Sequence, residues 1–120
     1  MKYIIAVSVL LSSSFSSYEF DETTELANYG IANAQYNLGI MYHAGDGIKQ
    51  SHEKAVEWFE KSAEQGNVDA QNNIGMMYKN GYGVKQNYEK AMKWVEKAAL
   101  QGRAKHQFNL GEIYEEKQRY

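Results

Sequence analysis

The sequence predicts an all-α fold, a right-handed solenoid of antiparallel helix pairs with a 36-residue period and about two and a half repeats. Residues 34–69 and 70–105 are identical at 19 of 36 aligned positions, and a third copy begins at His106. Self-similarity at a period of 20–50 residues is typical of repeat architectures. The 120 residues contain no proline, so long runs of helix are permitted. Apolar residues recur at helical spacing within each copy.

Residues 1–17 have the layout of a secretory signal peptide. Lys2 gives a positive start, Tyr3–Leu11 forms a short apolar core, and Ser14 and Ser16 are small residues spaced as before a cleavage point. The apolar run is shorter than the roughly 20 residues of a membrane span. We therefore expect an exported protein, periplasmic or extracellular, without a membrane span after cleavage. An uncleaved N-terminal anchor and a buried strand are the alternatives.

Residues 18–30 are expected to form a partial repeat that caps the N-terminal end with a short helix. Ala27 and Gly30 lie 36 residues before Ala63 and Gly66, and a terminal repeat that departs from the pattern is normal for a cap. The rest of the chain forms the repeat domain, 31–120, with units at 34–69, 70–105 and, incomplete, 106–120.

The first helix of each repeat is expected at 33–44, 69–79 and 104–117. On a helical wheel one apolar stripe per helix should be buried. This set is Ala34, Leu38, Met41 and Tyr42, then Ala70, Ile74, Met77 and Tyr78, then Leu110, Ile113 and Tyr114. A glycine recurs beside the stripe, as Gly39, Gly75 and Gly111. Because a mid-helix glycine costs about 1 kcal/mol against alanine, its recurrence predicts a close approach of the neighbouring helix.

The second helix of each full repeat is expected at 52–65 and 88–101. Gly-x-Gly loops end the preceding helices, and Ser51 and Asn87 are suited to cap the following ones. The expected buried set is Ala55, Trp58, Phe59, Ser62 and Ala63, then Ala91, Trp94, Val95 and Ala98.

These residues resemble the Sel-one-like repeat family, a relative of the tetratricopeptide repeats. The shared signature is A-x-x-N-L-G-x-M-Y-x-x-G-x-G-V followed by K-A-x-x-W-x-x-K-A-A-x-x-G. It is met by Ala34, Asn37, Leu38, Gly39, Met41, Tyr42, Gly45, Gly47, Lys54, Ala55, Trp58, Lys61, Ala63 and Gly66, and again 36 residues on. The third copy departs from it with His106 in place of a small residue and Lys117 in place of a loop glycine. This departure suits a capping helix.

The resemblance implies a small exported bacterial scaffold for protein–protein interaction, not an enzyme. It implies a protein or peptide partner, in adaptor roles that include host contact and toxin immunity. The alternative is a cell-wall or β-lactam hydrolase, as proposed for cysteine-rich relatives, but this chain has no cysteine. A third reading makes the chain part of a larger assembly, and no oligomeric state is predicted.

The formal charge of −2, with both signs interspersed, argues against nucleic acid as a partner.

The helical wheel also predicts a binding face on the first helices, opposite the buried stripe. Stacking should line these positions along a concave groove. The candidates are Tyr36, Asn37, Ile40 and His43, then Asn72, Asn73, Met76 and Lys79, then Phe108, Asn109, Glu112 and Glu115. Exposed aromatic and Met side chains are typical contact anchors. Burial between repeats is the other reading, and it is preferred for Ile40 and Met76. The recurring asparagines at 37, 73 and 109 are expected to hold the helix pair together by hydrogen bonds.

Catalytic and metal motifs are not found. The three histidines, at 43, 52 and 106, form no HExxH pattern. His43 and His52 flank one loop and can meet there, with Asp46 as a third ligand, but we expect no metal site and no cofactor. No G-x-S-x-G or S-x-x-K motif occurs, and the Gly-x-Gly loops follow helices, so they are not a dinucleotide fingerprint.

Overall fold

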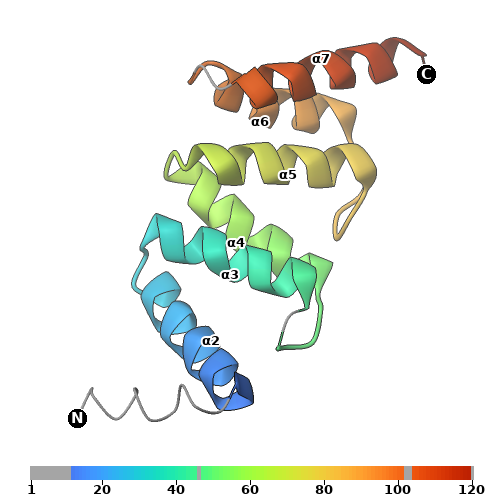
Figure 1. Ribbon diagram of the computed structural model, residues 1–120. Coiled ribbons are helices and arrows are strands. Elements are labelled where there is room, and N and C mark those ends of the chain that lie inside the picture. The colour runs from blue at the N-terminus through green and yellow to red at the C-terminus, as the bar shows by residue number, and fades with distance from the viewer. Residues whose placement is uncertain (1–11, 46, 102–103, 120) are drawn as a thin grey trace.

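The repeats fold into helices stacked in chain order (Figure 1). The structure, a computed structural model, describes residues 12–45, 47–101 and 104–119, and the side chains of 17–45, 47–101 and 109–119. Its helices are α2 (Ser12–Asn28), α3 (Ala32–Ala44), α4 (His52–Glu64), α5 (Val68–Asn80), α6 (Tyr88–Ala99) and α7 (Ala104–Arg119). The described part of the chain contains no strand, which confirms the all-α solenoid. Its handedness stays a prediction.

Each helix packs on the next one along the chain, from α2 on α3 to α6 on α7. The recurring glycine explains the close pairing within a repeat. A Cβ atom on Gly39 would lie 2.6 Å from Cδ1 of Phe59, and one on Gly75 would overlap the side chain of Val95. The predicted close approach is therefore confirmed in both full repeats. Around Gly111 a Cβ would meet nothing within 4 Å.

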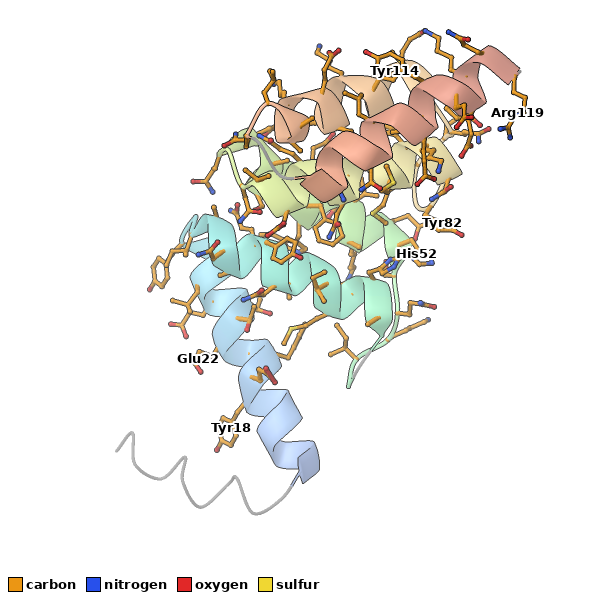
Figure 2. The ribbon with its side chains drawn as sticks, turned by 45° about the horizontal axis from the view of Figure 1, so that its top comes forward. Tyr18, Glu22, His52, Tyr82, Tyr114 and Arg119 are labelled. Carbon is orange, nitrogen blue, oxygen red and sulfur yellow. The ribbon has the colours of Figure 1, made fainter. Side chains whose placement is uncertain are left out.

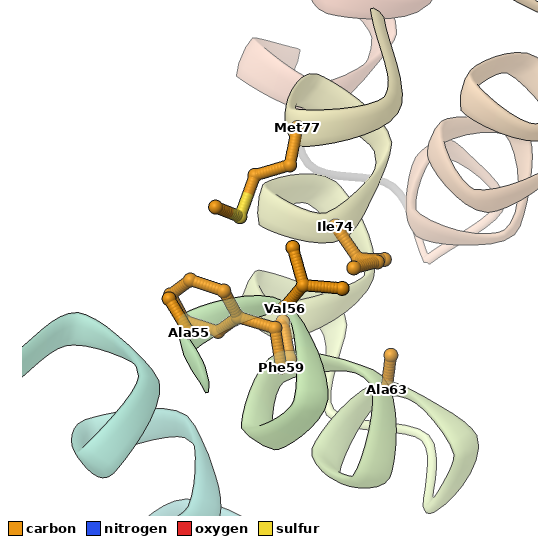
Figure 3. Packing of buried hydrophobic residues seen from close by; sticks show 7 residues of the cluster. Ala55, Val56, Phe59, Ala63, Ile74 and Met77 are labelled. Carbon is orange, nitrogen blue, oxygen red and sulfur yellow. The ribbon is translucent and has the colours of Figure 1, made fainter. Parts of the chain in front are cut away.

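The core runs along the stack as clusters between successive helices. The central one joins α4 to α5, with Val56 and Phe59 facing Ile74 and Met77 (Figure 3). Phe59 is 1 % exposed, and burying such a ring contributes about 1.5–3 kcal/mol. Separate clusters join α2 to α3 and α6 to α7. Each cluster depends on neighbouring repeats, as expected for a solenoid.

Helix ends follow the predicted capping. Ser51 accepts a hydrogen bond from the Lys54 N–H at 3.1 Å, and Asn87 does the same for Lys90 at 2.9 Å. Asn67, which sequence reasoning missed, caps α5 in the same way. Gly45 ends α3 at φ 70° and Gly81 ends α5 at φ 74°, the left-handed conformation that favours glycine.

The two ends of the stack differ from expectation. Helix α2 has 17 residues and begins at Ser12, so it is longer than the short cap expected over 18–30. Its Phe20 ring packs edge-on against Tyr42, with centroids 5.9 Å apart. The first 11 residues of the predicted signal peptide lie outside the described residues, and its cleavage stays a prediction. None of the helices described in the chain is long and apolar enough to cross a bilayer.

The predicted burial of Tyr114 is wrong, because this side chain is 39 % exposed. In the full repeats a lysine of the following helix lies over the equivalent ring, Lys54 over Tyr42 and Lys90 over Tyr78. The contact that the structure gives for Tyr114 is a 2.9 Å hydrogen bond from its hydroxyl to Glu96 of α6.

Candidate functional site

We call the side of the molecule formed by the candidate positions of α3, α5 and α7 the A-helix face. Between α5 and α7 it is joined by polar contacts. The Asn109 amide donates to the Asn72 side-chain oxygen at 2.9 Å, and Asn72 is buried. The Lys79 ammonium lies 2.9 Å from Glu116 and 3.9 Å from Glu112. These candidates therefore bind one another and connect successive repeats, which leaves less of them available to a partner.

The α3 part of the A-helix face is more open. Ile40 is 38 % exposed and Asn37 is exposed, so the burial that we preferred for Ile40 is wrong. Tyr36 is half-buried, and its ring centroid lies 5.9 Å from that of Phe59. Tyr36 thus belongs partly to the core between α4 and α5.

The recurring asparagines have three different roles. Asn109 bridges two repeats, Asn37 faces solvent, and Asn73 lines a cavity. The expected hydrogen bond within one helix pair is therefore not their common function. Glu115 is exposed. Phe108 is a candidate whose side chain lies outside the described set.

A cavity of about 240 Å³ opens between α3 and α5. Three candidate residues line it, His43, Asn73 and Met76. The other lining residues, which sequence reasoning did not select for the site, are Phe59, Met77, Asn80 and Tyr82. The lining combines apolar rings and thioethers with two amides and one imidazole, which is the composition of a recognition pocket. We call it the α3–α5 cavity.

Tyr82 reaches this cavity from the loop after α5. A Cβ atom on Gly83 would overlap the backbone of His52, so the loop packs against the start of α4 in the preceding repeat. This contact stacks the Tyr82 ring on His52, with centroids 5.4 Å apart and planes 18° apart. Figure 2 shows the two side chains together at one edge of the molecule. One sequence signal pointed to this position: a large aromatic between the loop glycines where the first repeat has Asp46.

Two histidines meet beside the cavity. His43 ends α3, His52 begins α4, and their ring centroids lie 5.0 Å apart. The expected meeting across the loop is therefore observed, while Asp46 lies outside the described residues. Burial lowers the pKa of His43, and the neighbouring His52 lowers it further. Both effects favour the neutral imidazole of His43 over the imidazolium.

This depressed pKa predicts a loss of stability in mild acid. Unfolded His43 takes up a proton near its ordinary pKa of about 6.5, whereas the folded form takes it up only at lower pH. The unfolded state thus binds more protons in this window, so the free energy of unfolding falls as pH drops below about 6.5. Urea unfolding between pH 7.5 and 5.5, roughly one unit either side of that value, measures the slope. His43→Gln should make this slope shallower; the same slope in the variant and in the wild type would contradict the assignment.

The serines of the repeats have structural partners. Ser51 caps α4, and the Ser62 hydroxyl donates to the Ala32 carbonyl at 2.8 Å, joining α4 to the start of α3. These hydroxyls therefore hold helices in place, and neither is prepared as a nucleophile. The described geometry gives no support to the hydrolase alternative.

The family model for the Sel1 repeat matches residues 32–67 and 68–102, more than half of the chain. The chain belongs to the Sel1 repeat family. This is the Sel-one-like family that the sequence motifs resemble. Sel1 repeats mediate protein–protein interaction, and proteins with this fold are generally non-enzymatic scaffolds.

Solved structures with the same fold support the membership. A Sel1 repeat protein from Oxalobacter formigenes aligns over 77 % of this chain with a TM-score of 0.73 and 35 % identity. A protective antigen of uropathogenic Escherichia coli with an SLR fold aligns over 77 % with a TM-score of 0.74 and 40 % identity. Cysteine-rich protein B of Helicobacter pylori, at 24 % identity, covers 76 % with a TM-score of 0.72 and shares the fold.

The relatives are mostly longer than this chain. It covers 38 % of the Oxalobacter protein, 20 % of the Escherichia antigen and 68 % of the Helicobacter protein. A putative sel1-like repeat-containing protein of Acanthamoeba polyphaga mimivirus is 49 % identical over 34 % of this chain and 7 % of its own length. A component of an ERAD-associated E3 ubiquitin-protein ligase of Arabidopsis thaliana is 38 % identical over 40 % of this chain and 8 % of its own length.

Proposed function

We propose that this Sel1 repeat chain is an exported scaffold that binds a protein or peptide segment, and that the α3–α5 cavity takes one apolar side chain of the partner. The observation that carries the proposal is the cavity itself, about 240 Å³ in volume and lined by Phe59, Met76, Met77 and Tyr82. This is less than the roughly 300–1,000 Å³ of small-molecule sites, so a single buried anchor residue is the better match. Such anchors supply most of the affinity in protein interfaces.

The polar lining supports a peptide occupant. Asn73 and Asn80 carry amides that donate and accept hydrogen bonds, and neither has a side-chain hydrogen bond within the described residues. An amide beside an apolar pocket suits a peptide backbone that passes the rim while one side chain enters. The flexible thioethers of Met76 and Met77 can adapt to anchors of different shape.

Random peptide display against the purified chain tests this function. We expect selected peptides to share one aromatic or large aliphatic residue, and Met76→Glu to weaken their binding about 100-fold, a loss of about 2.7 kcal/mol as for a hot-spot anchor. Leu100→Glu is the control, because Leu100 is 84 % exposed and does not line the cavity. Peptides that bind Met76→Glu as tightly as the wild type would overturn the cavity as the binding site.

Export and setting belong to the same proposal. The support for export is the pattern of residues 1–17, and mass spectrometry of the mature N-terminus tests it; an intact Met1 in the protein of the cell envelope would contradict cleavage. We propose contact with a host as the setting, with toxin immunity as the second candidate. The likeness to a protective antigen of uropathogenic Escherichia coli supports the first.

A further inference from the structure

The two histidines beside the α3–α5 cavity leave a chemical feature that peptide binding does not use. The Nδ1 atoms of His43 and His52 are both buried, and neither has a hydrogen-bond partner. Buried polar atoms in native proteins nearly always have one, and an exception points to a bound water or ion. Here two buried nitrogens without a hydrogen-bond partner lie on neighbouring rings, so one bound water or ion could serve both.

The ring geometry suits a shared ion. Metal–nitrogen bonds of about 2.0–2.1 Å place the centres of two imidazoles roughly 5–5.5 Å apart when they share one ion at an angle between tetrahedral and trigonal. The observed separation is 5.0 Å, with the planes inclined by 48°. Both rings sit on helix ends joined by one loop, and His52 is stacked on Tyr82. The pair is therefore arranged before any ion arrives.

The surrounding groups select the kind of ion. The described residues include no group of three or more His, Asp and Glu that could hold a metal. They therefore do not form the carboxylate-rich kind of site that hard ions prefer. Two thioethers, from Met76 and Met77, line the same cavity as His43. Thioethers favour soft ions such as Cu(I), and Cu(I) is satisfied by few ligands. We propose that His43 and His52, with a thioether of Met76 or Met77, bind one Cu(I) ion.

Anaerobic competition for Cu(I) against a chromogenic chelator tests the site on the full chain. We expect one ion per chain, and a loss of affinity of about 100-fold in His43→Gln or His52→Gln, since removing even an outer partner of a metal ligand costs 10–100-fold. The control is His106→Gln, which removes a histidine of another helix. Circular dichroism verifies that each variant is folded.

The thioether is tested with Ag(I), a redox-inert substitute for Cu(I). Its addition should shift the methyl NMR signal of Met76 or Met77 and leave that of Met92, which packs between α6 and α7. Equal Cu(I) affinity in the wild type and the His43→Gln, His52→Gln double variant would overturn the site. Tighter binding of Zn(II) than of Cu(I), or no shift at either methionine, would overturn the assignment of a soft ion.

Discussion

Phe59→Ala should lower the free energy of unfolding by about 3–5 kcal/mol, the usual cost of deleting a buried aromatic ring. Phe59 is 1 % exposed, packs against Ile74 and Met77 of the next repeat, and covers the backbone at Gly39. Its loss opens a void in the central cluster and removes contacts on both sides of α4. Urea unfolding monitored by circular dichroism gives the change in free energy.

The matched control is Leu100→Ala, which removes a similar apolar side chain that is 84 % exposed. We expect a change within about 0.5 kcal/mol, as for most surface substitutions. If Phe59→Ala lowered the free energy of unfolding no more than this control does, the cluster between α4 and α5 would not be a main source of the stability between the two repeats.

Sequence reasoning predicted the repeat fold well because each element depends on local rules. Helix bounds agree within a residue or two for α3 to α7. The caps Ser51 and Asn87 and the close approaches at Gly39 and Gly75 are confirmed. The helix bounds, caps and close approaches each depend on one helix and its immediate partner. Such local features can be read from the 3.6-residue period and the 36-residue repeat.

The candidate site was predicted only in part, because it depends on contacts between repeats. A wheel placed Asn72 on the outer face, but in the structure Asn72 is buried and its side-chain oxygen accepts a hydrogen bond from Asn109 of α7. Met77 was assigned to the core stripe, yet it also lines the α3–α5 cavity, and Tyr82 enters from a loop that no wheel describes. Orientation between successive repeats is a tertiary property, so a single-helix projection does not contain it.

Gly75→Ala and Gly111→Ala should change stability in opposite directions, although the two glycines occupy the same place in the repeat. Alanine in a helix interior is favoured over glycine by about 1 kcal/mol. At Gly75 the new Cβ would overlap the Val95 side chain and lie 3.1 Å from the Ala91 carbonyl oxygen. Overpacking of this kind costs typically 1–3 kcal/mol, and because part of the strain falls on backbone, we expect it to exceed the gain in propensity.

At Gly111 the same methyl group meets nothing within 4 Å, so only the propensity gain of about 1 kcal/mol remains. Urea unfolding should therefore place the Gly75→Ala midpoint below that of the wild type and the Gly111→Ala midpoint above it. The pair separates two reasons for a recurring glycine. Opposite shifts of the two midpoints would mean that glycine is required at this repeat position only where a second helix packs across it. A lower midpoint for Gly111→Ala would contradict this and mean that the helix itself requires the glycine.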